Sequence, residues 1–236
     1  MATKPNARSR KTTALVVAGS IFIVVAVLIA MVPLMLNLFG GGGVKTEGID
    51  AQSVKPASTE IDGEWKVTNR PGSNHSSAGF TFDEVLPGER RTTSGSTKSV
   101  SGTVTIEGGT LTAGEIDVDM TAITSDSDVR DNNVRRKIFL TDQYPNASFS
   151  VTERVDLSGI PEDGSIAQIE LTGDLTIMDQ TNEITDTFDV ARSADRLLVA
   201  GDIHINRLDY GVEAPEFVAA SIGEEGEINI RLNLAK

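Results

Sequence analysis

Residues 116–120 read Ile-Asp-Val-Asp-Met, and this alternation of apolar and acidic side chains decides the fold class of the chain. Because successive side chains of a β-strand point to opposite faces, the apolar side chains of this segment share one face and the acidic ones the other. The same alternation returns in residues 197–205 and in residues 228–234. A sheet built from such strands must hide its apolar face from water. The sequence therefore predicts an all-β domain with an apolar interior and an acidic surface.

Around these three segments, further stretches repeat the period of two, separated by clusters of Gly, Pro, Asn and Asp that favour turns. The predicted strands are residues 64–69, 78–84, 99–107, 111–123, 147–156, 166–178, 183–191, 196–207 and 227–234. Such a sheet can fold into a sandwich or close into a barrel, and closure also removes exposed strand edges. The alternation alone does not choose between these two architectures.

Residues 125–145 interrupt the alternation and predict one short helix. Asp128 is suited to cap its N-terminus, with Asp131 three residues later as an imperfect capping box. Val134 and Ile138 would lie on one face of this helix. We expect a weakly amphipathic helix that forms a lid or plug across one end of the β structure.

Residues 14–39 form an apolar run of 26 residues without a charged side chain. About 20 such residues span the core of a bilayer, whereas a cleavable signal peptide has a shorter apolar region. Four basic residues precede the run, and Lys45 and Glu47 follow it in balance, so the positive-inside rule places the N-terminus in the cytoplasm. We therefore expect an uncleaved signal anchor, with the rest of the chain outside the membrane.

The formal net charge of −13 divides at this apolar run. Residues 1–39 carry four basic and no acidic side chains, so the remaining chain carries −17. A flexible linker is expected after the run, because the chain there is rich in Gly, Ser, Thr and Lys and shows little apolar periodicity. The expected regions are a basic cytoplasmic N-terminus (1–13), a transmembrane signal anchor (14–39), the flexible linker (40–60) and a folded extracytoplasmic domain (61–236).

The composition argues against several classes of function. The absence of cysteine excludes disulfides, thiolate metal sites and a cysteine nucleophile. Only two histidines are present, His75 and His204, and they lack metal-ligand spacing, so no metal site is expected. An acidic surface repels phosphate backbones, which disfavours nucleic acid as a partner. Counting does not exclude a catalytic pair among 34 carboxylates, but nothing in the sequence marks one out.

The positive charge of the acidic domain is most concentrated at the predicted helix, where Arg130, Arg135, Arg136 and Lys137 gather. Such a cluster can contact the anionic head group of a lipid. It can equally complement the C-terminal end of a helix. The sequence leaves both interpretations open.

Six motifs follow one another along the folded domain. They are GFTF (79–82), SVSGTVTIEGG (99–109), IDVDMTAITSD (116–126) leading into VRDNN (129–133), YPNASF (144–149), LTGDLTIMDQTNEIT (171–185) and INRLDYG (205–211). Each motif is a weak signal by itself, but their order resembles the YceI-like family of bacterial extracytoplasmic proteins that bind lipids and polyisoprenoids. The resemblance covers about residues 61–236, and this chain would be a membrane-anchored member.

The resemblance implies an eight-stranded antiparallel, lipocalin-like barrel with a short helix near its mouth. Its elongated apolar lumen would hold a polyisoprenoid, quinone-like or fatty-acyl chain. By alternation, the side chains expected to point into this lumen are Phe80, Phe82, Ile116, Val118, Met120, Phe149, Leu175, Ile177 and Phe188. Eight strands leave an interior that is either filled by its own side chains or just wide enough for one small ligand. The sequence does not separate these two cases.

Four polar residues also match motifs of the family. Arg130 and Asp131 match an Arg-Asp pair, and Arg207 and Asp209 match a late Arg-x-Asp-x-Gly motif. They are candidates for polar groups at the mouth or for structural contacts, and for Arg130 with Asp131 we favour helix capping and an ion pair. One departure is Glu84, at or near a position where many members have a histidine. If that histidine touches a ligand head group, this protein should prefer a different head group.

We therefore expect a membrane-tethered, extracytoplasmic protein that sequesters or transports a lipid and is not an enzyme. A bound lipid is the only cofactor expected. The expected partners are an isoprenoid or acyl lipid and the membrane reached through the N-terminal helix, with a homodimer as a further option. The expected location is the cell membrane, with a single pass. Two alternatives remain: an envelope hydrolase that uses a carboxylate pair, and a structural or signalling ectodomain with a solid barrel.

Overall fold

The computed structural model describes residues 43–86, 89–213 and 221–236. The expected cytoplasmic N-terminus and signal anchor, residues 1–39, lie outside the described residues. Within the described part of the chain, no helix is both long enough and apolar enough to cross a bilayer. The chain divides into two compact units, and the description that follows concerns the unit formed by residues 42–236.

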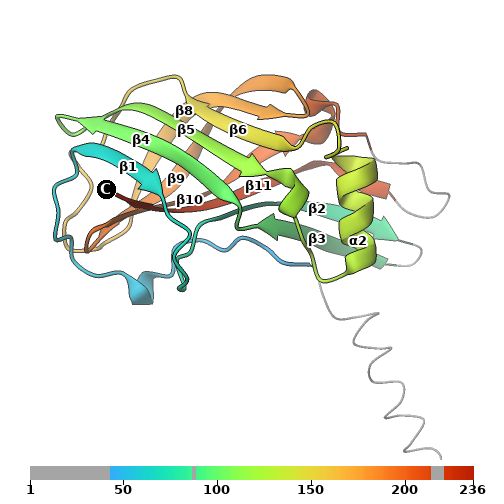
Figure 1. Cartoon of the computed structure of the whole chain (residues 1–236), viewed down its shortest axis with the longest axis horizontal. Coiled ribbons are helices and arrows are strands. Elements are labelled where there is room, and N and C mark those ends of the chain that lie inside the picture. Colours follow the sequence, from blue (N-terminus) through green and yellow to red (C-terminus); the bar gives the residue numbers. More distant parts are fainter. Residues whose placement is uncertain (1–42, 87–88, 214–220) are drawn as a thin grey trace, which may run out of the picture. The chain divides into compact units, whose positions relative to one another are not determined.

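Eight strands close into an antiparallel barrel (Figure 1). In order around the barrel they are β1 (Gly63–Val67), β4 (Val100–Glu107), β5 (Thr110–Asp119), β6 (Asn146–Val151), β8 (Ala167–Ile177), β9 (Gln180–Ser193), β10 (Arg196–Asn206) and β11 (Ser221–Ala235). The barrel closes because β11 also pairs with β1, with Lys66 opposite Ala235 and Val67 opposite Leu234. The eight-stranded antiparallel barrel expected from the family resemblance is therefore confirmed.

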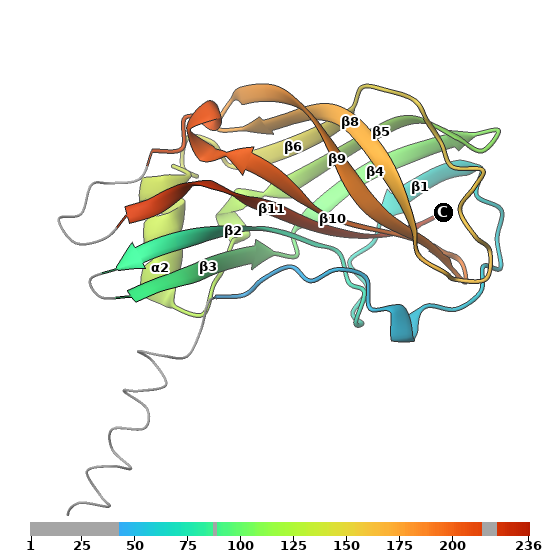
Figure 2. The ribbon, with the colours of Figure 1, turned by 180° about the vertical axis from the view of Figure 1, so that it is seen from behind.

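A hairpin of β2 (Ser77–Leu86) and β3 (Glu89–Thr97) extends the wall beside β11 (Figure 2). β2 pairs with the N-terminal part of β11, whereas β1 pairs with its C-terminal end. The alternation predicted β2 but not β3, because β3 has no apolar side chain. Polar contacts hold β3 instead, including a 2.8 Å hydrogen bond between the hydroxyls of Thr81 and Ser94.

Two predicted strands end differently from the expectation. The segment 111–123 ends as β5 at Asp119 and continues into a 3₁₀ turn, Met120–Ala122. Asp119 starts this turn, because its carboxylate accepts a 2.9 Å hydrogen bond from the Thr121 amide. The segment 147–156 splits into β6 and the two-residue strand β7 (Val155–Asp156), which pairs with β5.

Helix α2 (Asp128–Asn133) and the π-helical turn η3 (Val134–Ile138) form the predicted interruption of the sheet. They lie across one end of the barrel, which we call the mouth (Figure 1). Val134 is buried and Ile138 is partly buried, and both pack against the barrel core. The helix and its apolar face are therefore confirmed.

The expected cap of this helix is wrong. The capping position is occupied by Ser127 rather than Asp128, and Ser127 makes no capping bond through its side chain. The carboxylate of Asp131 instead reaches back to Ser125, accepting hydrogen bonds from its amide at 2.7 Å and from its hydroxyl at 2.6 Å. Asp131 is buried, with 6% of its surface exposed, so these bonds satisfy a carboxylate that water scarcely reaches.

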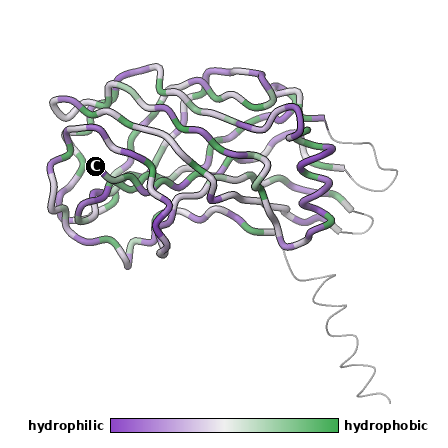
Figure 3. The backbone as a smooth tube through the Cα atoms, viewed as in Figure 1, coloured by the Kyte–Doolittle hydropathy of each residue, from purple (hydrophilic) through white to green (hydrophobic). Residues whose placement is uncertain are grey.

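Hydrophobic and hydrophilic residues alternate along the strands (Figure 3). The buried hydrophobic side chains form one core inside the barrel. Along β8, Leu171, Leu175 and Ile177 point inward and are only 3–6% exposed. Trp65 on β1 is 2% exposed, and its indole N–H donates to the carbonyl of Ile61 at 2.7 Å. The fold thus turns the apolar face of each of the eight barrel strands toward one shared interior.

Residues 43–60, which belong to the expected flexible linker, lie along the outside of the barrel, and we call this segment the strap. It starts beside β3, where the Val44 amide donates to the Ser94 carbonyl at 3.2 Å. Lys45 then bridges Glu227 at 3.1 Å and Asp202 at 3.5 Å on the outer wall.

Farther along, the strap reaches the turn between β9 and β10. The Ser58 amide donates to the Ala194 carbonyl at 2.8 Å, and the Ala57 amide donates to the Glu162 carbonyl at 2.7 Å. Between these two ends the strap lies over polar side chains of the outer wall, and Asn229 is fully buried there. The structure therefore places this part of the linker against the barrel, because polar groups of the wall supply hydrogen-bond partners that composition does not reveal.

Candidate functional site

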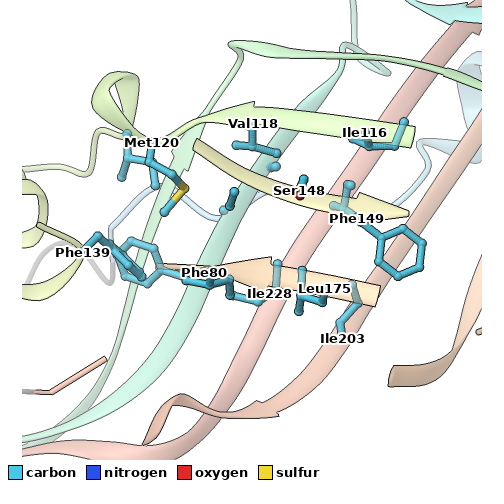
Figure 4. A pocket seen from close by; sticks show the side chains of 16 residues that line it. Phe80, Ile116, Val118, Met120, Phe139, Ser148, Phe149, Leu175, Ile203 and Ile228 are labelled. Atoms are coloured by element: carbon cyan, nitrogen blue, oxygen red, sulfur yellow. The ribbon is translucent and has the colours of Figure 1, made fainter. Parts of the chain in front are cut away.

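The barrel interior contains an apolar cavity next to the mouth, which we call the outer chamber (Figure 4). Its empty space is about 580 Å³, solvent-open parts included. Six strands, the 3₁₀ turn after β5 with Ile123 next to it, and the segment after η3 supply its lining. Ser148 is the one polar side chain in this lining. The lining residues are Ala78, Gly79, Phe80, Ile116, Val118, Met120, Ile123, Phe139, Ala147, Ser148, Phe149, Leu175, Ile177, Ile203, Ile228 and Ile230.

A second apolar cavity, the inner chamber, lies deeper in the barrel and has about 670 Å³ of empty space, counted in the same way. Its lining includes Leu111, Leu171 and Leu197 and contains no polar side chain among the described residues. Four residues line both chambers and so mark the boundary between them: Ile116, Phe149, Ile203 and Ile230. The two chambers therefore follow one another along the lumen.

A third cavity, the mouth pocket, lies beneath α2 and η3 and has about 450 Å³ of empty space. Phe80 and Phe139 line both the mouth pocket and the outer chamber, with ring centroids 5.4 Å apart. This pocket also contains the polar side chains of Glu84, Thr93 and Arg207. Polar groups of the lumen are therefore concentrated at its mouth.

All of the apolar residues predicted to face the lumen line one of these three cavities. Phe80, Phe82, Ile116, Val118, Met120, Phe149, Leu175, Ile177 and Phe188 are the residues concerned. The alternation missed Phe139, which follows η3 and belongs to no strand. The short apolar pair Ile138-Phe139 at the end of the predicted helix was the only available signal for it.

Glycines explain why four phenylalanines line the lumen without filling it. Each of the four rings lies over a glycine of a neighbouring strand, in the space that a side chain would otherwise take. A Cβ added to any of these glycines would meet the ring. It would lie 2.8 Å from Phe80 Cε1 if added to Gly95, and 2.5 Å from Phe149 Cζ if added to Gly173. Added to Gly201 it would lie 2.6 Å from Phe188 Cδ1, and added to Gly226 it would collide with the ring of Phe82. Because the rings take up wall space, open volume remains along the axis of the barrel.

The guanidinium of Arg207 is held by backbone carbonyls. Its nitrogens donate to the carbonyls of Gly223 at 3.0 Å, Val212 at 2.5 Å and Ile222 at 3.5 Å. Among the described residues no carboxylate forms an ion pair with it, so its charge lies at the mouth pocket with dipoles as partners. Asp209 is exposed and lies outside the pocket, and its backbone carbonyl accepts a 3.0 Å hydrogen bond from the Asn182 side chain.

Arg130 and Asp131 do not pair with each other. Arg130 forms an ion pair with Asp126, one helical turn earlier, while Asp131 bonds Ser125. Neither residue lines the chambers or the mouth pocket. Their contacts hold the start of α2 in place.

The rest of the basic cluster divides into a bound and a free part. Arg135 donates to the carbonyls of Thr121 at 3.4 Å and Ile123 at 3.3 Å, which ties η3 to the end of β5. Arg136 and Lys137 are exposed on the outer side of the mouth. They are the members of the cluster that are available to an external anion.

Carboxylates gather on the outer wall, and none lines the outer or the inner chamber among the described residues. Burial alone would raise the pKa of Asp186, but hydrogen bonds from the amides of His204 and Thr187 and from the His204 ring outweigh it and hold this pKa below its ordinary value. His204 itself is exposed, as its alternation with Ile203 and Ile205 predicts. In the ranges that the structure describes, no three His, Asp or Glu side chains form a group that could hold a metal ion.

The fold and site define the chain as a small closed β-barrel with an apolar lumen, whose polar groups lie at a helix-covered mouth. The model of the YceI-like domain matches residues 65–234, and the chain belongs to the YceI-like family. The membership expected from the six sequence motifs is therefore confirmed.

Two solved structures illustrate the similarity. A polyisoprenoid binding domain from Saccharophagus degradans aligns with a TM-score of 0.55 and 16% identity, over 72% of this chain and 97% of that domain. BcnA from Burkholderia cenocepacia aligns with a TM-score of 0.51 and 20% identity, over 66% of this chain and 96% of BcnA. At such identities the likeness concerns the fold. A comparison with curated proteins found no match.

Proposed function

We propose that this protein binds the apolar chain of a lipid in its lumen and sequesters or transports it. The observation that carries the proposal is the pair of consecutive chambers, which are lined by apolar side chains and left open by the ring–glycine pairs. The relative from Saccharophagus degradans is described as a polyisoprenoid binding domain, which supports the same class of ligand. Isoprenoid, quinone-like and fatty-acyl chains all have this chemistry.

Burial of hydrocarbon supplies the binding energy. Each methylene that leaves water contributes about 0.8 kcal/mol, so a chain of a dozen or more carbons is held without a catalytic group. A charged head group would find no partner in either chamber, and its burial there would cost several kcal/mol. The lipid therefore enters with its apolar end first, and its head group stays at the mouth.

The mouth pocket offers two partners to a head group. Thr93 is 4% exposed and lines the pocket, and its buried hydroxyl has no hydrogen-bond partner among the described residues. The guanidinium of Arg207 lines the same pocket and can donate further hydrogen bonds. Glu84, at or near the position where many family members have a histidine, also lines the pocket. Arg91 pairs with its carboxylate at 3.4 Å and compensates its charge, so Glu84 does not by itself repel an anionic head group.

We further propose that residues 14–39 anchor the protein in the cell membrane, with the barrel on the extracytoplasmic side. The support is the uncharged apolar run and the four basic residues that precede it. Sodium carbonate extraction of cell membranes tests the anchor: the full chain should stay with the membrane. External protease should digest the barrel in intact spheroplasts. Release by carbonate would overturn the anchor, and protection from protease would overturn the orientation.

Lipid extraction tests the binding proposal. The full chain, purified in detergent, should release an isoprenoid or acyl lipid that mass spectrometry detects. Ala147→Phe should abolish this signal, because Ala147 lines the outer chamber and the added ring would fill it. Ala113→Phe is a matched control, because Ala113 is exposed on β5, and it should retain the lipid of the wild type.

Two results would overturn the binding proposal. One is the absence of lipid from the wild-type chain after exposure to an excess of isoprenoid and acyl lipids, which would favour a structural or signalling ectodomain. The other is equal lipid in Ala147→Phe and Ala113→Phe, which would place the lipid outside the lumen. Circular dichroism of both variants shows whether each retains the β-barrel.

A further inference from the structure

Gly201 and Phe188 lie just beyond the boundary between the two chambers. Ile203, two residues from Gly201 on the same face of β10, lines both chambers, whereas Val199 on the other side of Gly201 lines only the inner one. Phe188 on the neighbouring strand β9 is 3% exposed and also lines only the inner chamber. The ring of Phe188 therefore stands at the entrance to the inner chamber.

The position of this ring depends on the missing side chain of Gly201. A Cβ on Gly201 would lie 2.6 Å from Cδ1, 2.9 Å from Cε1 and 3.2 Å from Cγ of Phe188, and these are its three nearest atoms. The added methyl would thus meet the ring and not the backbone, so the ring would have to move. Open space next to it lies in the inner chamber, so the ring would turn toward the axis of the lumen.

The facing ring has the same arrangement. Phe149 lines both chambers, and its ring centroid lies 6.4 Å from that of Phe188. A Cβ on Gly173 would lie 2.5 Å from its Cζ, but also 2.6 Å from the Ser150 carbonyl oxygen. A substitution at Gly173 would therefore disturb the backbone as well, which makes Gly201 the cleaner position to test.

We propose that Gly201, by letting the Phe188 ring lie against the wall, keeps the inner chamber accessible, so that the preferred ligand is a chain long enough to occupy both chambers. This inference rests on the proposed lipid-binding function and adds a selection by chain length. A short chain fits in the outer chamber and gains nothing from the inner one. A long chain gains about fourfold in affinity for each further methylene that it buries there.

A competition experiment with the full chain tests this inference. The protein in detergent micelles is exposed to an equimolar mixture of farnesol, geranylgeraniol and solanesol, in order of increasing length, and is then repurified. Mass spectrometry gives the ratio of bound solanesol to bound farnesol. The ratio of each variant is divided by the ratio of the wild type, which cancels the unequal partition of the alcohols into micelles. Unfolded protein does not contribute to the ratio.

Gly201→Ala should lower the solanesol-to-farnesol ratio by about tenfold or more, the effect of two to three methylenes excluded from the inner chamber. The double variant Gly201→Ala/Phe188→Leu should return the ratio to within about threefold of the wild type, because the obstructing ring is gone. Gly159→Ala is the control. It adds the same methyl at an exposed glycine that lines none of the three cavities, where a Cβ has nothing within 4 Å. Its ratio should change by less than about threefold.

The inference is overturned by an unchanged ratio in Gly201→Ala, by failure of the double variant to restore it, or by an equally large fall in Gly159→Ala. If Gly201→Ala does not fold, Phe188→Trp enlarges the ring at the same place and must lower the ratio in the same way. Failure of the proposed function looks different, because the wild type would then retain no alcohol of any length.

Discussion

At the scale of single residues, partly buried polar side chains of this barrel stabilise backbone carbonyls in turns and where strand pairing is irregular. Arg207 is the clearest case, since its guanidinium bonds the carbonyls of Val212, Ile222 and Gly223. Hydrogen bonds from a charged donor contribute about 1.5–3 kcal/mol each in favourable cases. The family motif Arg-x-Asp-x-Gly therefore has a structural role here in addition to its place at the mouth pocket.

Arg207→Lys should destabilise the barrel by about 1–3 kcal/mol, because one ammonium cannot reach carbonyls that a planar guanidinium bonds in different directions. Urea unfolding followed by tryptophan fluorescence measures this change. Arg136→Lys is the control, because Arg136 is exposed, and its effect should stay within about 0.5 kcal/mol. Equal effects of the two substitutions would contradict the structural role of Arg207.

Alternation located residues that line the lumen because a strand has only two faces, and one face of each of the eight barrel strands is apolar. It could not predict the open lumen, because openness depends on which glycine lies beside which ring across two strands. Gly201 and Phe188, for example, are brought together by the register of β9 and β10, in which Ala200 lies opposite Asp189. That register is a tertiary property that no local pattern in the sequence states.

At the scale of elements, the start of α2 shows that the capping preference of Asp128 does not decide where the helix begins. Asp128 has the residue type and spacing of a cap, but the chain turns at Ser125 so that Asp131 becomes the partner of the preceding backbone. β3 is the opposite case, since it has no apolar pattern at all and is defined by pairing with β2. Both errors have one cause: a short polar segment takes its conformation from partners outside it, Ser125 for Asp131 and β2 for β3, which no apolar periodicity reveals.

Asp131→Ala should cost about 1–2 kcal/mol of stability, because it leaves the Ser125 amide and hydroxyl without their partner in a largely buried place. Asp128→Ala should cost about 0.5 kcal/mol or less, because Asp128 is exposed and caps nothing. Chemical denaturation of the two variants side by side measures both values. The reverse order would restore Asp128 as the cap.

The strap should loosen in acid. Burial alone would raise the pKa of Glu227, but hydrogen bonds from Lys45 and Asn229 outweigh it and hold this pKa below its ordinary value. A carboxyl with a depressed pKa adds stability above its unfolded pKa, about 4.3 for Glu, and this stability is lost as the pH falls through the folded pKa. The contact between strap and wall is therefore intact at neutral pH and weakens below about pH 4.

Glu227→Gln tests this pH dependence. Its melting temperature should lie below that of the wild type near pH 7, and the gap should shrink as the pH falls to about 3, because the wild type then loses the same charge. Glu183→Gln is the control, an exposed carboxyl on β9 that makes no ion pair with the described residues. A gap for Glu227→Gln that stays constant with pH would contradict the role of its charge.

At the scale of the whole molecule, the barrel depends on contacts between distant parts of the chain. Only two residue pairs join β1 to β11 directly, and β4 holds the other edge of β1 through four pairs. The strap adds a further connection on the outside, from β3 to the turn after β9. The sequence motifs identified the family and hence the barrel, but the strap has no motif, so only the structure shows its course.

Two truncations separate the strap from the rest of the N-terminal region. Deletion of residues 1–42 should leave the melting temperature of the barrel within about 2 °C of its value in the full chain. Deletion of residues 1–60 should lower the melting temperature by about 10 °C. This deletion removes the strap residues that bond Glu227, Arg231 and Asn74, and it exposes Asn229. Equal melting temperatures of the two truncated proteins would show that the strap adds nothing to stability.

Under the proposed lipid binding, the concentration of polar side chains at the mouth pocket has a consequence for delivery of the lipid. An occupant that enters tail first must leave head first, so the receiving membrane or protein meets the head group before any carbon of the chain has moved. Discrimination between lipids can then take place at hand-over instead of at capture. Rates of transfer to acceptor vesicles should accordingly vary with the head group more strongly than affinities do, and equal variation of both would exclude such a checkpoint.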